Sequence, residues 1–207
     1  LNGLSFIQGL IKLTDHEVLQ KEKQVMNAMV KVAGFPHFKE LKEFDFDFQE
    51  GINKEQIIDF TSHRFIYKNE NIIFMGTSGV GKTHLATSIG ISAAKNRIST
   101  YYIKCSSLIA QLQKAKLENR LEARLKHFTK YKLLIIDELG YLPIDSEDSK
   151  LFFQIIDRRY EKRSTIITTN INFSKWDDIF KDSTIASAIL DRVLHHAHVV
   201  NITGKSY

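Results

Sequence analysis

Gly76–Thr83 combines the residue types and the spacing that hold a phosphate chain. Its sequence, GTSGVGKT, follows a short apolar run and precedes residues with helical spacing. Glycines let backbone N–H groups approach phosphate oxygens without Cβ clashes, and a following helix adds the positive end of its dipole. Lys82 is then placed to contact the β- and γ-phosphates, and the Thr83 hydroxyl to bind Mg²⁺. The nucleotide-binding residues predicted from this pattern are Gly76, Thr77, Ser78, Gly79, Val80, Gly81, Lys82, Thr83 and His84.

A second apolar run, Lys132–Asp137, is followed by Glu138 and so ends in two carboxylates. In a parallel sheet such a run ends at the edge where the phosphate loop lies. Asp137 is placed to hold Mg²⁺ through water, and Glu138 to orient and deprotonate the attacking water. A kinase needs no water-activating base at this position, so Glu138 favours hydrolysis.

Two further polar residues complete the candidate catalytic set. Asn170 closes the next apolar run, where its amide can bond the γ-phosphate and the attacking water. Arg192 lies near the end of the last predicted helix, from which an arginine can reach the nucleotide of a neighbouring subunit. An ion pair with Asp191, or a favourable interaction with the helix dipole, explains Arg192 equally well. The residues alone leave both interpretations of Arg192 open.

The elements that must position these residues alternate between strands and helices. Short apolar runs predict strands at Asn71–Met75, Thr100–Lys104, Lys132–Asp137, Ser164–Thr169 and His198–Ile202. Helical spacing predicts helices at Thr83–Asn96, Ser106–Phe128, Ser149–Arg159 and Thr184–Leu194. Near-continuous apolar strands that alternate with helices predict a parallel sheet covered on both faces. The predicted fold class is therefore α/β, with a helical N-terminal extension.

The N-terminal third has a different pattern. Ser5–Leu13 predicts a short helix, and Thr14–Glu17 has the form of a capping box that begins a second helix. The second helix should end near Ala33, because Pro36 blocks its continuation. Phe44–Phe48 alternates aromatic and acidic residues with period two, which predicts a short extended segment with one buried face.

Composition limits the class of protein. The chain has 207 residues, of which 43% are hydrophobic and 26% are charged. This length and composition predict one folded domain with an additional smaller segment. Its apolar runs are shorter than the roughly 18 residues of a membrane span, and no secretory leader is visible. One cysteine, Cys105, excludes an internal disulfide and fits a reducing compartment. We therefore expect a cytoplasmic protein with no membrane partner.

The positive charge is concentrated in one stretch. The formal net charge is +5, and residues 111–132 carry seven Lys or Arg against two Glu. A polyanion-binding surface and a solvated helix face both have this composition.

Several segments together resemble the IstB-type ATPases, the AAA+ helper proteins encoded by insertion sequences. They are GTSGVGKTHLA, LLIIDELGYLP, STIITTN and SAILDRVLHHAHVVNITGKSY, and FPHFKELKEFDFDFQEGINKEQI is similar to the linker of that family. The resemblance covers nearly the whole chain. It implies an AAA+ P-loop ATPase core with a five-stranded parallel sheet over residues 51–207, after a partial helical N-terminal domain and linker over residues 1–50.

The resemblance also implies an activity. It is ATP hydrolysis with ATP and Mg²⁺, by a homo-oligomer that assembles on double-stranded DNA and assists a transposase in target selection. Arg192 would be the trans-acting finger, and the basic stretch would be an inserted element that faces DNA. The residues it would use are Lys114, Lys116, Arg120, Arg124, Lys126 and Lys130. The alternative within the same class is a replicative helicase loader of the DnaC or DnaI type.

Alternatives from other classes are a monomeric P-loop kinase and a DNA-binding scaffold that binds ATP without turnover. The carboxylate pair and the lack of an arginine-rich lid argue against the kinase. Relatives usually continue beyond the SY ending with an arginine that senses the nucleotide. Since this chain ends at Tyr207 and begins without Met, we expect it to be trimmed at both ends.

The remaining polar clusters have simpler interpretations. His195, His196 and His198 have the look of a metal cluster, but we expect adjacent positions at a helix end to point in different directions, so they predict no metal-ligand set. Arg158 and Arg159 are expected to form surface ion pairs, and Trp176 to pack in the core.

Overall fold

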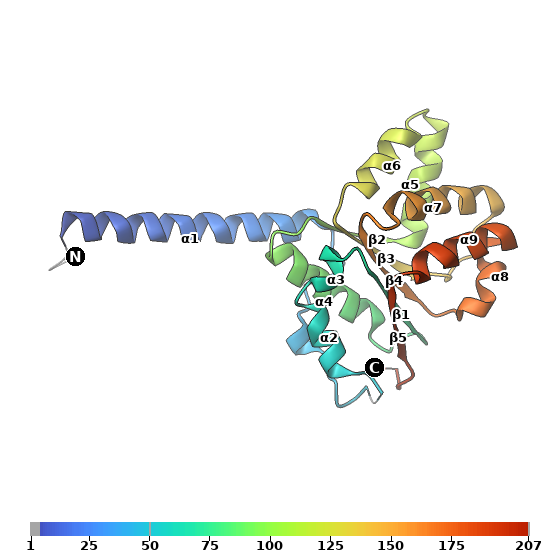
Figure 1. Cartoon of the computed structure of the whole chain (residues 1–207), viewed down its shortest axis with the longest axis horizontal. Coiled ribbons are helices and arrows are strands. Elements are labelled where there is room, and N and C mark those ends of the chain that lie inside the picture. The colour runs from blue at the N-terminus through green and yellow to red at the C-terminus, as the bar shows by residue number, and fades with distance from the viewer. Residues whose placement is uncertain (1–4, 50, 207) are drawn as a thin grey trace.

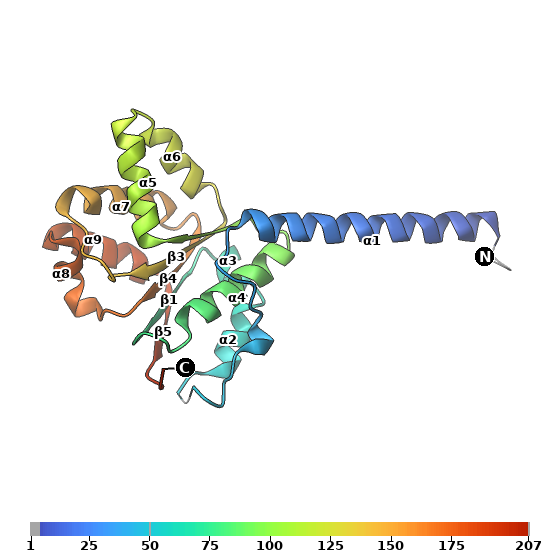
Figure 2. The same cartoon turned by 180° about the vertical axis from the view of Figure 1, so that it is seen from behind.

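Five parallel strands form a twisted sheet with helices on both faces, and one long helix projects from this body (Figures 1 and 2). The computed structural model describes residues 5–49 and 51–206. Residue 50, at the predicted boundary between the N-terminal region and the core, lies outside the described residues. The strands are β1 (Asn71–Gly76), β2 (Thr100–Lys104), β3 (Leu133–Leu139), β4 (Ser164–Thr169) and β5 (Ala197–Ile202). Their order in the sheet is β2-β3-β4-β1-β5. The predicted α/β class and parallel sheet are confirmed.

The helices follow the predicted alternation, with three short additions. They are α1 (Phe6–Val32), α2 (Lys54–Phe60), α3 (Arg64–Tyr67), α4 (Lys82–Lys95), α5 (Cys105–Leu117), α6 (Leu121–Thr129), α7 (Ser146–Arg159), α8 (Trp176–Phe180) and α9 (Ser183–Leu194), with 3₁₀ turns η1 (Leu41–Glu43) and η2 (Phe173–Lys175). The sequence analysis did not predict α2, α3 or α8, which are four to seven residues long. None of the helices within residues 5–49 and 51–206 has the length and apolar character needed to cross a membrane.

Successive side chains of each strand face opposite layers. On one face Ile72 and Phe74 pack against α2, α3 and α4. On the other face Ile73 packs in a cluster built by α5 to α9, which includes Trp176, as expected for a packing residue. Because helices cover both faces of the sheet, the middle residues of β1, β3 and β4 are buried and apolar, which is the pattern that made these strands predictable.

The predicted break in the N-terminal helical region is absent, since α1 is one helix of 27 residues. Ser5 and Gln8 form the capping box at its start. The Thr14 hydroxyl instead donates to the carbonyl of Leu10 at 2.9 Å, a bond that a threonine can make inside a helix. The helix stops at Ala33, as predicted.

The Phe44–Phe48 segment is a turn, so the predicted extended segment is wrong. The Asp45 carboxylate accepts the N–H groups of Asp47 and Phe48, both at 3.0 Å. Such Asx bonds compete with a strand conformation.

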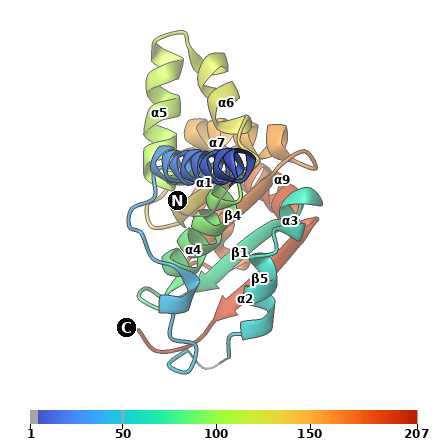
Figure 3. The same cartoon turned by 90° about the vertical axis from the view of Figure 1, so that its left-hand side faces the viewer.

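The predicted helix Ser106–Phe128 is two helices. Asn119 takes a left-handed conformation with φ of 54°, and the Arg120 N–H turns back to the carbonyl of Ala115 at 2.8 Å. Figure 3 shows α5 and α6 side by side, extending from the body. We call this pair, together with the C-cap residue Lys130 of α6, the basic hairpin, residues 105–130.

The two adjacent arginines of α7 have different environments. Arg158 pairs with Glu122 at 2.8 Å on the surface, as expected. The surface prediction for Arg159 is wrong, because that side chain is only 1% exposed. Its guanidinium donates to the carbonyls of Phe128, Tyr131 and Ser164 and to the hydroxyl of Thr165. Arg159 thus ties the end of the basic hairpin to β4.

Candidate nucleotide-binding site

The phosphate loop joins β1 to α4, and its backbone requires glycine, as Gly81 and Gly76 show. Gly81 precedes α4 with φ of 93°, a left-handed conformation that glycine adopts without strain. At Gly76, a Cβ atom would lie 2.3 Å from the carbonyl oxygen of Ile202 on β5. The loop therefore passes close to the neighbouring strand, and α4 begins where the loop ends.

Lys82 lies inside this loop and is 5% exposed. Its ammonium donates to the carbonyls of Gly76 at 2.8 Å and Thr77 at 2.6 Å. Burial lowers the pKa of Lys82, and the nearby Asp137 opposes that effect. The buried ammonium of Lys82 thus lies against the backbone of the loop that is predicted to bind phosphate.

The two predicted Mg²⁺ ligands contact each other. The Thr83 hydroxyl donates to the fully buried Asp137 carboxylate, at 2.9 Å to Oδ1 and 3.1 Å to Oδ2. Tyr102 donates to Oδ2 at 2.6 Å, and Thr168 donates to Oδ1. Desolvation and the bond to Asp137 raise the pKa of Tyr102. An oxygen-only donor set beside a phosphate loop fits Mg²⁺, which binds few protein oxygens and keeps several waters.

Glu138 leaves the regular path of β3. It has φ of 62°, and the register with β4 shifts between Ile136 and Leu139. Its backbone N–H donates to Thr168 Oγ1 at 2.9 Å, and its carboxylate pairs with Lys104 of β2 at 2.9 Å. The resulting bulge gives Glu138 a different environment from the buried Asp137.

A cavity of about 620 Å³ brings the predicted residues together. Its lining includes Ser78, Gly79, Gly81, Lys82, Thr83, His84 and Glu138. Asn170 does not line it; the residue is exposed just after β4, the strand beside β3.

The linker after α1 forms another wall of this cavity through Lys39, Glu43 and Asp45. His84 of α4 meets the Glu40 carbonyl at 3.1 Å. The Glu40 carboxylate pairs with Lys42 and Lys95, which lower its pKa to about 2.

Arg192 lies away from this cavity. Its Nε pairs with Asp157 at 2.8 Å, rather than with Asp191, and its guanidinium lies over Phe153 with 4.8 Å to the ring centroid. The next residue, Val193, accepts a bond from the side chain of Asn71 at the start of β1, at 3.1 Å. The phosphate loop begins at the other end of β1, about 17 Å away for a strand of this length.

The six predicted DNA-binding residues have different surroundings. Lys114, Arg120 and Arg124 line one groove of about 510 Å³ between α5 and α6. Lys116 faces α7, where it pairs with Glu147 at 3.2 Å. Lys126 is exposed, and the Lys130 ammonium lies 5.1 Å from the centroid of the Tyr131 ring.

Sequence reasoning missed several residues at the nucleotide edge: Lys39, Glu43, Asp45, Tyr102, Lys104 and Tyr141. For Lys104 a signal was present, because it ends a predicted strand. Parallel pairing places it opposite Asp137. The linker residues carry no such signal, since only the folded chain brings them to α4.

This strand order, with a phosphate loop after the interior strand β1 and an acidic pair on β3, defines a P-loop ATPase of the AAA+ class. The family described as IstB-like ATP binding protein matches residues 2–207, and the chain belongs to it. The resemblance seen in the sequence is confirmed.

Relatives from insertion sequences are similar over the whole chain. The IS232 ATP-binding protein of Bacillus thuringiensis subsp. berliner is 66% identical over 206 residues, which are 100% of this chain and 82% of that protein. The IS21 ATP-binding protein of Pseudomonas aeruginosa is 41% identical over 204 residues, 99% of this chain and 77% of that protein.

Solved structures show the same fold. The DnaC helicase loader has a TM-score of 0.61 and 25% identity, and covers 72% of this chain and 86% of its own. DnaI has a TM-score of 0.66 with 22% identity over 81% of this chain and 89% of its own, a likeness of fold alone.

Proposed function

We propose that this protein hydrolyses ATP as a homo-oligomer on double-stranded DNA and assists the transposase of an insertion sequence in target selection. One observation carries the proposal. Lys82, Thr83 and Glu138 line one cavity at the carboxyl end of the strands. Arg192 lies instead near the amino end of β1, beside Asn71. A complete site with an arginine then needs two protomers.

Within one protomer, the proposed roles follow from position. Lys82 binds the β- and γ-phosphates, while Thr83 and Asp137 hold Mg²⁺. The metal neutralises charge on the phosphates when it is bound. Glu138 accepts the proton of the attacking water. Asn170 does not line the cavity, so its proposed role in orienting that water and the γ-phosphate rests on its place directly after β4 and not on a contact.

Arg192 is proposed to act on the nucleotide of the neighbouring protomer. In the single chain Asp157 pairs with its guanidinium, so assembly would exchange this carboxylate for phosphate oxygens. Such a finger contributes roughly 10³–10⁵ in rate where it has been measured.

The basic hairpin is proposed to contact DNA phosphates, with affinity that depends on salt and little on sequence. The insertion-sequence relatives support the role in transposition. We also propose that residues 1–50 belong to a helical N-terminal domain and linker, and residues 51–207 to the ATPase core.

Mixing two inactive variants tests the shared site. Lys82→Ala protomers keep Arg192, and Arg192→Ala protomers keep Lys82. In a head-to-tail assembly mixed one to one, roughly a quarter of the interfaces combine both intact residues. We therefore expect ATPase activity to return to at most about that fraction of wild type.

Mixing Lys82→Ala with Glu138→Gln provides the matched control, because both changes damage the same half of the site and no interface is complete. No recovery with Arg192→Ala at any ratio, from proteins that still fold and assemble, would refute the shared site.

A further inference from the structure

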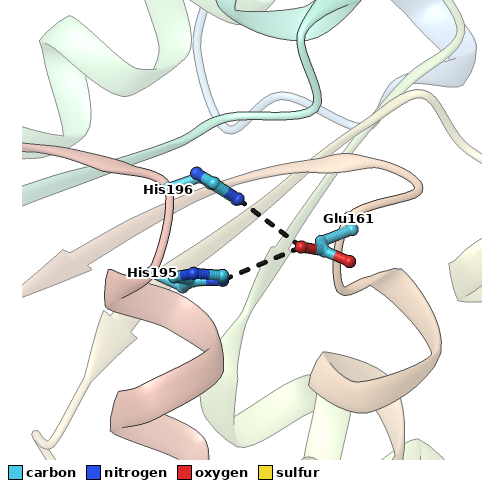
Figure 4. Close-up of side chains that lie close together, drawn as sticks. All are labelled: Glu161, His195 and His196. Carbon is cyan, nitrogen blue, oxygen red and sulfur yellow. Dashed lines mark ion pairs between the residues drawn. The ribbon is translucent and has the colours of Figure 1, made fainter.

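We propose that Glu161, His195 and His196 form a binding site for one divalent transition-metal ion, with Zn²⁺ as the ion that fits best. His195 caps the end of α9, His196 follows it, and Glu161 lies in the turn between α7 and β4. The expectation that the two imidazoles diverge is wrong, because their ring centroids are 4.1 Å apart. Figure 4 shows both rings directed at the Glu161 carboxylate.

The spacing of the donor atoms fits a small cation. Glu161 Oε1 is 3.5 Å from His196 Nε2 and 3.8 Å from His195 Nδ1. One ligand atom from each residue lies within 4.8 Å of the others. Tetrahedral Zn²⁺ with bonds of about 2.0–2.2 Å places its ligand atoms about 3.3 Å apart. Small rotations of these three side chains, each about half exposed, therefore suffice to close the site.

The backbone holds the two segments in place. Glu161 has a left-handed φ of 56°, and its carbonyl accepts a bond from the Asn69 side chain at 3.0 Å. The His195 N–H donates to the Asp191 carbonyl at 3.1 Å, which fixes the end of α9. A metal ion would thus join the α7–β4 turn to the α9–β5 connection.

The donor set indicates which ions bind. Two imidazole nitrogens and one carboxylate oxygen suit Zn²⁺, Co²⁺ and Ni²⁺ better than Mg²⁺. The nearby positive charge of Arg192 is paired with Asp157. Within residues 5–49 and 51–206, no second group of three His, Cys, Asp or Glu side chains has this spacing. Burial raises the pKa of the Cys105 thiol to about 12, so this cysteine does not compete as a thiolate.

Tyr160 connects the site to its surroundings. Its hydroxyl contacts His195 Nδ1, and its ring stacks on His195 with centroids 5.7 Å apart. The Arg192 guanidinium lies 5.9 Å from the centroid of the same ring. A metal ion bound at His195 Nδ1 would displace the Tyr160 hydroxyl from that atom. It would thereby alter the position of the Tyr160 ring that the Arg192 guanidinium contacts.

The test is Zn²⁺ titration of the protein without a polyhistidine tag, nucleotide or DNA, followed by calorimetry and by Co²⁺ absorption spectra. We expect one ion per chain at micromolar protein concentration, and a tetrahedral Co²⁺ spectrum. His196→Ala and Glu161→Gln should each weaken binding about tenfold or more. Tyr160→Phe should bind at least as tightly, because it removes the competitor for Nδ1.

His16→Ala, an exposed histidine on α1, is the matched control and should leave binding unchanged. Melting curves without metal show whether each variant folds. Absence of binding to the wild type, or binding that neither His196→Ala nor Glu161→Gln weakens, would overturn the proposed metal site. Neither result decides whether the protein hydrolyses ATP.

Discussion

Lys104 and Glu138 form an ion pair of 2.9 Å that joins the carboxyl ends of β2 and β3. Glu138 also lines the nucleotide cavity, so Lys104 occupies one oxygen, Oε1, of the carboxylate that is proposed to hold the attacking water. Lys104 is 47% exposed, and the bond to Glu138 raises its pKa. Lys104 is therefore charged at neutral pH, and its ion pair holds the carboxylate of Glu138, the proposed base, in one position.

Lys104→Ala should raise the basal ATPase rate. Exposed ion pairs contribute about 0.2–1 kcal/mol, so the increase should be at most about fivefold. Phosphate release measured without DNA checks this, and Lys104→Arg, which keeps the pair, should stay near the wild-type rate. A lower rate for Lys104→Ala would mean that Lys104 assists catalysis.

Glu138→Gln should separate ATP binding from hydrolysis. The amide keeps the shape of the side chain but cannot take a proton, and loss of a general base costs about 10²–10⁴ in rate. Nucleotide affinity, measured with a fluorescent analogue, should stay within a few-fold of wild type. Glu43→Gln changes another carboxylate that lines the cavity and should leave the rate nearly unchanged; an equal loss in both variants would argue against Glu138 as the base.

Lys126→Ala and Lys130→Ala should weaken binding to duplex DNA of any sequence. Each lost phosphate contact should reduce the slope of log affinity against log salt by about 0.9. Titrations at several salt concentrations measure this slope. Lys21→Ala, a lysine on α1 paired with Glu17, should leave it unchanged, and unaltered slopes in the hairpin variants would place the DNA elsewhere.

Arg159→Ala should strongly destabilise the fold. Each buried acceptor left unsatisfied costs about 1–3 kcal/mol, and Arg159 donates to four, so the free energy of unfolding should fall by about 3 kcal/mol or more. Denaturant unfolding measures this loss. The neighbouring Arg158→Ala removes a surface ion pair and should cost about 1 kcal/mol or less; comparable losses would contradict the different roles assigned to the two arginines.

The inner strands were predictable because burial on both sheet faces makes their middle residues apolar. Helix spacing was less decisive in the basic hairpin, where apolar residues continue at helical intervals across the left-handed Asn119. Local polar bonds caused two further errors. The Thr14 hydroxyl and the Asp45 carboxylate can each satisfy backbone groups in more than one way, and the sequence does not specify which.

The positions of the phosphate loop and of Asp137 and Glu138 could be predicted because the loop follows one apolar run and the two carboxylates come at the end of another. Contacts between distant segments could not. The buried Arg159 donates to carbonyls of residues about 30 positions earlier in the chain. The linker lines the nucleotide cavity only because it packs on α4 in the folded chain.

Imaging by electron microscopy of the protein with duplex DNA and a non-hydrolysable ATP analogue tests the central claim most directly. The proposal predicts ordered multimers along the duplex, with the nucleotide between Lys82 and Glu138 of one protomer and Arg192 of the next. Single protomers on DNA, with Arg192 still paired to Asp157 and distant from every nucleotide, would contradict it.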